Sequence, residues 1–190
     1  FIDLYRKGRV YRRAAPTIWC PTCRTAIAQA EVDDVAREAT MVTLVFALED
    51  GGALPIATTR PELLPACVAV FVHPDDARYR ALVGRHAITP LFGERVPILN
   101  DYRVDPAKGT GAVMCCTFGD ATDVEWWYTY HLPLIVVLDD AGRLTGRAGP
   151  YAGLTVSEAR ARIIADLEAA GEVRGREAIR QTVRVHERCD

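Results

Sequence analysis

Residues 109–127 read GTGAVMCCTFGDATDVEWW, and the rest of the chain is interpreted outward from this stretch. The glycines that flank Thr110 permit a tight turn, and the apolar run 112–116 that follows is typical of a buried strand. Asp120 stands where a helix is expected to begin, and Asp123 falls one turn later on the same helical face. The stretch therefore predicts a turn, a strand and a helix that carries two acids over the strand end.

Two acids at a helix start have a plain structural interpretation, because they cap free backbone N–H groups and are favoured by the helix macrodipole. A second stretch, LPIATTRPELLPACVAVFV at 54–72, changes the balance. It predicts two strands interrupted at Pro61. Thr58, Thr59 and Arg60 then lie where the first strand ends, a place where side chains and backbone N–H groups can face a ligand.

Together these stretches resemble the editing domain, or connective-polypeptide insertion, of the class I aminoacyl-tRNA synthetases for valine, isoleucine and leucine. The resemblance rests on ATTRPE at 57–62, on GTGAV at 109–113, and on GDATDVEWW at 119–127, which is most similar to the valyl-tRNA synthetase family. It implies hydrolysis of mischarged threonyl-tRNA(Val). The valine enzyme is the known example of this need, since its hydrophobic pocket rejects isosteric threonine only about a hundredfold.

The resemblance also implies roles for individual residues. Asp123 matches the acid that holds the substrate α-ammonium, and Asp120 matches a residue that recognises the threonine side chain. Arg60 matches an arginine that contacts the terminal adenosine or its phosphate. The implied catalytic residues are Asp123 and Asp120, and the implied substrate-binding residues are Thr58, Thr59, Arg60, Thr110, Met114 and Cys116.

The chain departs from many bacterial valine enzymes at three positions of these motifs. Leu63 stands where they carry Thr, and Met114 and Cys116 stand where Lys and Thr follow the GTG turn. Cys116 is either a weak polar contact or a small core side chain, and the pair Cys115-Cys116 has no neighbouring His to activate a thiol. No side chain presents itself as a general base. We therefore expect a positioned water, assisted by the adjacent ribose hydroxyl, with no cofactor in the hydrolysis.

Four candidate metal ligands lie near the two ends of the sequence, Cys20 and Cys23 in a C-x-x-C pair and His186 and Cys189 in an H-x-x-C pair. Thiolate and imidazole are ligands of zinc, and this spacing lets both members of a pair reach one ion. A structural zinc site is therefore one hypothesis, and four residues without a joint role is another. The related synthetases commonly carry a zinc knuckle at the neck of this insertion, which favours the metal.

Three other functions stay open. Isoleucyl-type editing of valyl-tRNA(Ile) needs a pocket that excludes by size, which Asp120 and the Trp126-Trp127 pair argue against. A noncatalytic zinc-knuckle module would only dock tRNA or a protein. A thiol oxidoreductase would use Cys20 and Cys23, because WCPTC superficially resembles the thioredoxin motif, but segment 10–18 before it makes a poor core strand and bound zinc would stop the thiols from cycling.

Length and composition bound the remaining classes. The chain has 190 residues, of which 49% are hydrophobic, enough for one domain with a sizeable core. Its formal net charge of -2 is not that of a dedicated nucleic-acid binder. We find no apolar run of membrane-spanning length and no signal-peptide pattern, and expect a soluble cytoplasmic protein. Because the sequence begins without Met, we expect it to be a fragment cut from a longer protein. Nucleotide-binding signatures of the HIGH, KMSKS or P-loop kind are missing, so ATP binding and amino-acid activation would belong to the rest of a parent synthetase.

The remaining pattern predicts a mixed α/β fold, with a barrel-like, largely antiparallel sheet, peripheral helices and a zinc-knuckle-like neck. We expect residues 1–30 and 180–190 to form the neck and residues 31–179 to form the editing domain. The implied partners are the acceptor end of tRNA(Val) and the parent synthetase, with no membrane. One or two strands are expected within 31–48, and further strands at 86–90, 94–99, 134–138 and 182–185. Helices are expected at 75–83 and, after a Thr155/Glu158 capping box, at 157–170.

Overall fold

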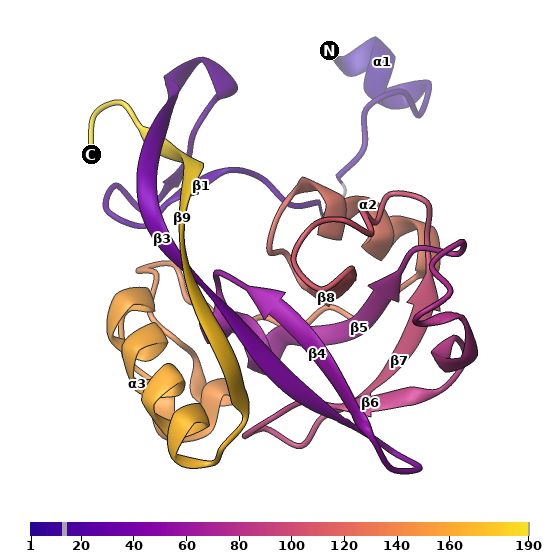
Figure 1. Cartoon of the computed structure of the whole chain (residues 1–190). Coiled ribbons are helices and arrows are strands. Elements are labelled where there is room, and N and C mark those ends of the chain that lie inside the picture. Colours follow the sequence, from indigo (N-terminus) through magenta and orange to yellow (C-terminus); the bar gives the residue numbers. More distant parts are fainter. Residues whose placement is uncertain (13–14, 190) are drawn as a thin grey trace.

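The computed structural model describes residues 1–12 and 15–189, so Arg13 and Ala14 of the segment expected to be a poor strand lie outside the described residues, as does Asp190. Its main body is a curled seven-stranded sheet (Figure 1). Six strands follow the order β4-β3-β6-β7-β5-β8, and the seventh, β9, pairs with β3. The strands are β3 (Val32–Leu48), β4 (Ala53–Thr58), β5 (Cys67–Val72), β6 (His86–Ile88), β7 (Arg95–Asn100), β8 (Ala112–Cys116) and β9 (Val173–His186). Among the described strands of this sheet, β5 and β7 pair in parallel and the other pairs are antiparallel. The barrel-like, largely antiparallel sheet is confirmed.

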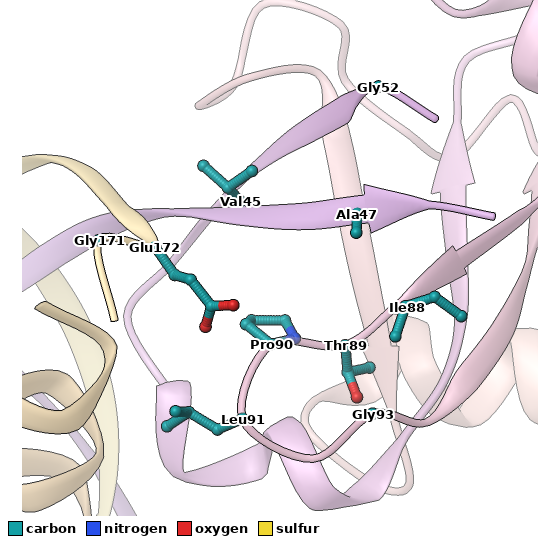
Figure 2. Close-up of a pocket in the computed structure, with 10 residues that line it drawn as sticks. All are labelled: Val45, Ala47, Gly52, Ile88, Thr89, Pro90, Leu91, Gly93, Gly171 and Glu172. Carbon is teal, nitrogen blue, oxygen red and sulfur yellow. The ribbon is translucent and has the colours of Figure 1, made fainter. Parts of the chain in front are cut away.

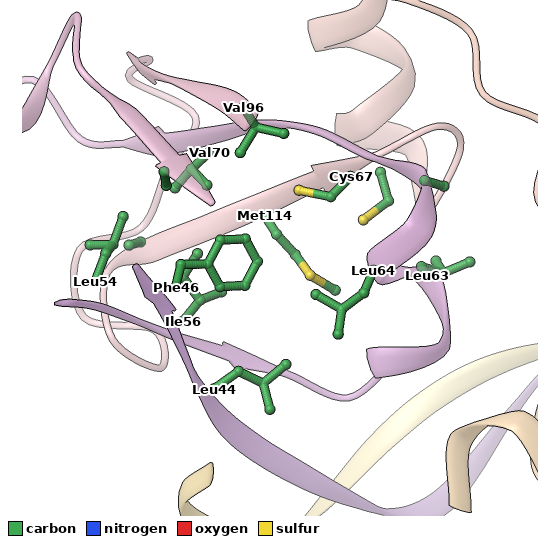
Figure 3. Packing of buried hydrophobic residues seen from close by; sticks show 14 of the residues in the cluster. Leu44, Phe46, Leu54, Ile56, Leu63, Leu64, Cys67, Val70, Val96 and Met114 are labelled. Atoms are coloured by element: carbon green, nitrogen blue, oxygen red, sulfur yellow. The ribbon is translucent and has the colours of Figure 1, made fainter. Parts of the chain in front are cut away.

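Strands β5 and β8 are covered on both faces. Their successive side chains point to opposite sides of the sheet, and the side chains on both sides are buried. On the inside of the curl, Val70 and Met114 pack with Phe46 in the larger apolar cluster (Figure 3). On the outside, Phe71 stacks on Trp126 with their ring centroids 4.2 Å apart. Burial on both faces fixes the position of the loop after β8, where the predicted acids lie.

Helices lie at the periphery of the sheet, as expected. The α-helices are α1 (Ile2–Arg6), α2 (Ala121–Tyr130) and α3 (Val156–Ala169), and the 3-10 helices are η1 (Gln29–Glu31), η2 (Pro61–Ala66), η3 (Arg80–Leu82) and η4 (Gly146–Tyr151). The capping box of Thr155 and Glu158 starts α3 as predicted. The helix buries Ala159, Ile163 and Leu167 completely, so its apolar face is fixed against the sheet.

The neck is an extension of the sheet. Strands β3 and β9 pair from Val32 opposite His186 into the body, and this long ribbon carries the C-terminal end of β9 to the short hairpin of β1 (Trp19–Cys20) and β2 (Thr25–Ala26) (Figure 1). Because the ribbon runs through both expected domains, the boundaries at 30/31 and 179/180 stay a prediction.

Two expected elements are wrong. Residues 75–83 contain only the 3-10 helix Arg80–Leu82, because Asp76 accepts a hydrogen bond from the backbone N–H of Arg78 and forms a local turn in place of a helix. Residues 134–138 form only an isolated bridge from Leu138 to Leu144, and Leu134 is 53% exposed with no described neighbouring strand to pair with. None of the described helices is long and apolar enough to cross a membrane.

Candidate active site

Of the three motifs that carry the resemblance, the ATTRPE segment lies against both of the others. A Cβ added to Gly109 would lie 2.9 Å from the Cβ of Ala57, so the GTG turn rests directly on β4. Arg60, just after β4, donates from Nη1 to the carbonyl oxygen of Gly119 at 2.5 Å. Residues 57–62 thus contact both the GTG turn, which precedes β8, and the GDATD segment, which follows β8, and the segments after β4 and β8 form one rim.

The two acids of this rim have different surroundings. Asp120 is exposed and is the N-cap of α2, where its Oδ1 accepts from the backbone N–H of Asp123 at 2.9 Å. Asp123 is 6% exposed, and its Oδ2 accepts from the N–H groups of Gly119 at 3.0 Å and of Cys116 at 3.4 Å. The plain capping interpretation therefore holds for Asp120 alone, and Asp123 is a carboxylate turned into the protein.

Burial decides the protonation of Asp123. Burial first, and the nearby charge of Asp120 second, raise the pKa of the Asp123 carboxyl to about 7, although hydrogen bonds from Cys115, Cys116 and Gly119 act in the opposite direction. A cation held against this carboxyl would favour its charged form. A buried acid with a pKa near neutrality, beside a second acid at the surface, is typical of a functional site.

Gly119 is required by the space that the Asp123 carboxyl occupies. A Cβ at position 119 would lie 2.3 Å from Asp123 Oδ2, far inside van der Waals contact. The glycine of the GDATD motif therefore lets its own N–H approach the carboxylate closely. Gly111 has a similar steric reason, since its φ is +81° and a Cβ there would lie 2.9 Å from the backbone carbonyl oxygen of Pro106.

The polar side chains that follow β4 make more contacts within the protein than the sequence indicated. Thr58 is 9% exposed, and its hydroxyl oxygen accepts from the backbone N–H of Arg60 at 3.0 Å. Thr59 is half-buried beside it. Arg60 lies 3.5 Å through Nε from Oε1 of Glu62, in addition to its bond to Gly119, and its side chain is 39% exposed. Part of the guanidinium stays open to a ligand.

Glu62 is a buried acid beside Arg60 that the sequence reasoning did not single out. Its side chain is completely buried, and both carboxylate oxygens accept from Arg160 of α3, at 2.7 and 2.9 Å. A signal was present, since Glu62 is a lone acid at the head of the apolar run 63–72. Its partner is 98 residues away in the sequence and could not be identified there.

The other predicted substrate contacts lie deeper. The Thr110 carbonyl accepts from the Tyr79 hydroxyl at 2.7 Å, which holds the GTG turn. Met114 and Cys116 belong to the interior cluster. A hydrogen bond with Cys67, together with burial, raises the pKa of the Cys116 thiol well above its usual value. A neutral, buried thiol is a poor nucleophile, and contact of Met114 and Cys116 with substrate stays a prediction.

The four candidate metal ligands gather at the neck. One ligand atom from each of Cys20, Cys23, His186 and Cys189 lies within 4.8 Å of all the others. The Sγ of Cys23 is 2.9 Å from the Sγ of Cys189 and 3.8 Å from Nδ1 of His186. The backbone N–H of Cys23, with smaller contributions from other hydrogen bonds, lowers the pKa of Cys20 to about 6, which favours its thiolate. Three thiols and an imidazole gathered in one cluster are a donor set that suits one tetrahedral zinc ion.

The position of Cys20 and Cys23 in the neck argues against the thiol oxidoreductase hypothesis. Cys20 and Cys23 lie on the separate two-stranded hairpin of β1 and β2, and not after a strand of the main sheet. All the described cysteines are free thiols. The thioredoxin-like context that the oxidoreductase hypothesis requires is therefore missing from the described part of the chain.

A pocket of about 440 Å³ lies apart from the acids. Figure 2 shows it between β3, the loop after β6 and the start of β9, with Val45, Ala47, Ile88, Pro90, Leu91 and Glu172 among its lining residues. Burial raises the pKa of the Glu172 carboxyl. None of the predicted site residues lines this pocket, so its size does not make it the site of the expected chemistry.

Comparison with known proteins gives close relatives over the whole chain, although no family model matches. The chain is 51% identical over 189 residues to a valine-tRNA ligase of Thermoplasma acidophilum and covers 24% of that protein. It is 50% identical over 186 residues to that of Pyrococcus horikoshii, with 97% of the chain aligned, and 48% identical over 198 residues to that of Haloarcula marismortui. The chain thus spans between 21% and 24% of the length of these relatives.

A solved structure shares the fold. The agnB2 LeuRS of Agrobacterium radiobacter K84, in a ternary complex with tRNA and LeuAMS, matches with a TM-score of 0.56 and 21% identity. The match covers 95% of this chain and 31% of that one. At this identity the likeness concerns the arrangement of the elements and not the chemistry of individual residues.

Proposed function

Since this chain belongs to the valine-tRNA ligase family, we propose that it is the editing part of such an enzyme and hydrolyses the ester of mischarged threonyl-tRNA(Val). The observation that carries the proposal is the buried carboxyl of Asp123, whose pKa is raised to about 7, at the same rim as the ATTRPE motif. An aminoacyl ester presents an α-ammonium group, which is the cation that such a carboxyl would bind.

Asp120 accounts for the choice of threonine over valine. Its carboxylate is exposed at the start of α2, where it can accept a hydrogen bond from the threonine hydroxyl. Valine has a methyl group in that place and would desolvate the carboxylate without replacing its lost hydrogen bond to water. The compared relatives are valine enzymes, which favours threonyl-tRNA over the substrate of isoleucyl-type editing.

The hydrolysis would proceed without a protein nucleophile. A water oxygen attacks the carbonyl carbon, the ester bond to the ribose breaks, and the adjacent ribose hydroxyl helps to carry the proton from water to the departing ribose oxygen. The products are threonine and tRNA with a free terminal hydroxyl. The protein contributes orientation of the α-ammonium through Asp123 and of the terminal nucleotide through the open part of the Arg60 guanidinium.

The neck completes the proposal. Cys20, Cys23, His186 and Cys189 would hold a structural zinc ion, which supplies folding energy to the neck and no chemistry to the ester. Residues 1–30 and 180–190 would form this neck, and residues 31–179 the editing domain. The remaining partners would be the acceptor end of tRNA(Val) and the other parts of an ATP-dependent synthetase in the cytoplasm.

Asp120→Ser tests the selectivity. Serine is also a good N-cap, so α2 keeps its start, but its short side chain does not reach where the carboxylate did. We expect the ratio of kcat/KM for threonyl-tRNA(Val) over valyl-tRNA(Val) to fall about 10- to 100-fold, the equivalent of one hydrogen bond to a charged group. Deacylation of both preformed esters measures this ratio. Asp33→Ser, which removes an exposed acid from the ribbon, is the matched control, and an unchanged ratio in Asp120→Ser would refute the assignment.

A further inference from the structure

Glu62 is a buried acid to which the proposed hydrolysis assigns no role. It is an acid at full burial, held through both oxygens by Arg160. Burying an ion pair costs desolvation that apolar packing would avoid, so such a pair is weak evidence for a purely stabilising role. Glu62 lies in η2, directly between the α3 helix that supplies Arg160 and the rim that carries Arg60. Its position is what distinguishes it from an ordinary core residue.

The contacts of Glu62 continue to the acids. Oε1 of Glu62 is 3.5 Å from Nε of Arg60, and Nη1 of Arg60 donates to the carbonyl oxygen of Gly119 at 2.5 Å. The N–H of Gly119 donates to Oδ2 of Asp123 at 3.0 Å. The peptide group whose oxygen Arg60 holds is also the one that leads into Asp120. The Arg160–Glu62 hydrogen bonds, the Glu62–Arg60 ion pair and the Arg60–Gly119 hydrogen bond therefore connect α3 to the backbone that holds Asp123 and leads into Asp120.

We infer that Glu62 is a positioning residue of the editing site: held by Arg160, it fixes the Arg60 guanidinium and, through it, Gly119 and the carboxyl of Asp123. The role in hydrolysis rests on the proposed function, but the fixing of Asp123 does not. A misplacement of about 1 Å at a reacting group can lower a rate about a hundredfold, which is the scale on which such fixing acts. Glu62 forms ion pairs with both Arg60 and Arg160, and a neutral amide in its place would hold two guanidinium groups poorly.

Glu62→Gln separates positioning from packing, since the two side chains have nearly the same shape. With Arg60 released, Gly119 would no longer be held against Asp123, and the carboxylate would lose a hydrogen bond that favours its charged form. We expect the midpoint of the Asp123 titration, followed by the ¹³C chemical shift of its carboxyl carbon in the full-length protein, to rise by about one pH unit. In deacylation we expect kcat to fall about 10- to 100-fold and KM to change less than about threefold.

Asp166→Asn is the matched control. Asp166 is a carboxylate of α3, the helix that carries Arg160, and accepts from the Tyr151 hydroxyl at 2.7 Å, so the substitution removes an anchoring charge of this helix without touching Glu62. We expect it to leave the Asp123 midpoint unchanged. If Glu62→Gln does not fold, Arg160→Lys replaces a side chain that is 39% exposed and keeps its charge while losing the two-bond contact, and the midpoint should rise in the same direction.

The outcomes are distinct. A higher Asp123 midpoint in Glu62→Gln or Arg160→Lys, and not in Asp166→Asn, supports the positioning role. A midpoint equal to that of the unmodified protein, or an equal rise in all three variants, overturns it. The titration needs no substrate, so a protein that fails to hydrolyse threonyl-tRNA would refute the proposed function and leave the inference about Glu62 to be decided by the midpoint.

Discussion

Replacing Asp123 by Asn should make the protein more stable at pH 8 and remove its hydrolytic activity. The pKa of Asp123 is raised from 3.8 to about 7, chiefly by burial, so keeping this group charged opposes folding. The corresponding free energy is up to about 4 kcal/mol at a pH above 7. An amide of the same shape avoids this cost but offers no charge to an α-ammonium group.

The sign of the pH dependence follows from proton binding. Between pH 3.8 and about 7 the folded protein keeps a proton on Asp123 that the unfolded chain releases. The contribution of Asp123 to stability is therefore lost as the pH rises through this window and is constant above it. We expect the free energy of unfolding of Asp123→Asn, minus that of the unmodified protein, to grow from pH 4 to pH 8 in denaturant titrations.

Asp76→Asn is a control for which we expect a change in stability of the opposite sign. A hydrogen bond from Arg78 lowers the pKa of Asp76, so its charge stabilises the folded protein at neutral pH and this contribution is lost as the pH falls below 3.8. Its replacement should lower stability at pH 8. A stability difference for Asp123→Asn that does not change with pH would show that the Asp123 carboxyl is charged in the fold throughout this range.

Removal of zinc should unfold the neck and leave the sheet intact. The β1-β2 hairpin has few buried side chains of its own, Cys20 being the buried one of its four strand residues. Structural zinc contributes about 10–16 kcal/mol of apparent binding free energy in small zinc-finger peptides, which is ample to order such a segment. We expect one zinc per chain, and chelation should abolish hydrogen-exchange protection in residues 19–26 and 183–189 while β5 and β8 stay protected.

Two cysteine variants make this prediction specific. Cys23→Ser should lose the metal, because Cys23 lies in contact with both Cys189 and His186. Cys67→Ala should lower the stability of the core, where Cys67 is 1% exposed, and keep the full metal content. Protein prepared with zinc present that contains none, or a hairpin whose exchange chelation does not alter, would contradict the zinc assignment.

The parts of the fold that were predictable from the sequence are those fixed by local chemistry. The cap of α2 at Asp120 and the capping box at Thr155 each depend on residues three apart, and both are confirmed. Pro61 ends the strand that it was expected to end. The four-residue metal cluster follows from two short pairs whose spacing matches a zinc site.

The expected helix at 75–83 failed for a local reason, the Asp76 turn, and the other failures depend on long-range partners. Residues 134–138 have the composition of a strand, but no described strand lies where this segment could pair. Two acids three apart give no sign of which one is buried, because that depends on where α2 meets the end of β8. Glu62 and Arg160 come together only when α3 packs on η2, and this pairing also explains why Arg60 is partly occupied and not wholly free for a ligand.

We propose that this chain removes threonine from tRNA(Val) through Asp123. The most direct measurement is the rate of hydrolysis of preformed threonyl-tRNA(Val) and valyl-tRNA(Val) by the full-length protein and by its Asp123→Ala variant. We expect rapid loss of the threonyl ester, slow loss of the valyl ester, and a reduction of at least about a hundredfold for the threonyl ester in the variant. Equal hydrolysis of the threonyl ester by the variant, or none by the unmodified protein, would contradict the account.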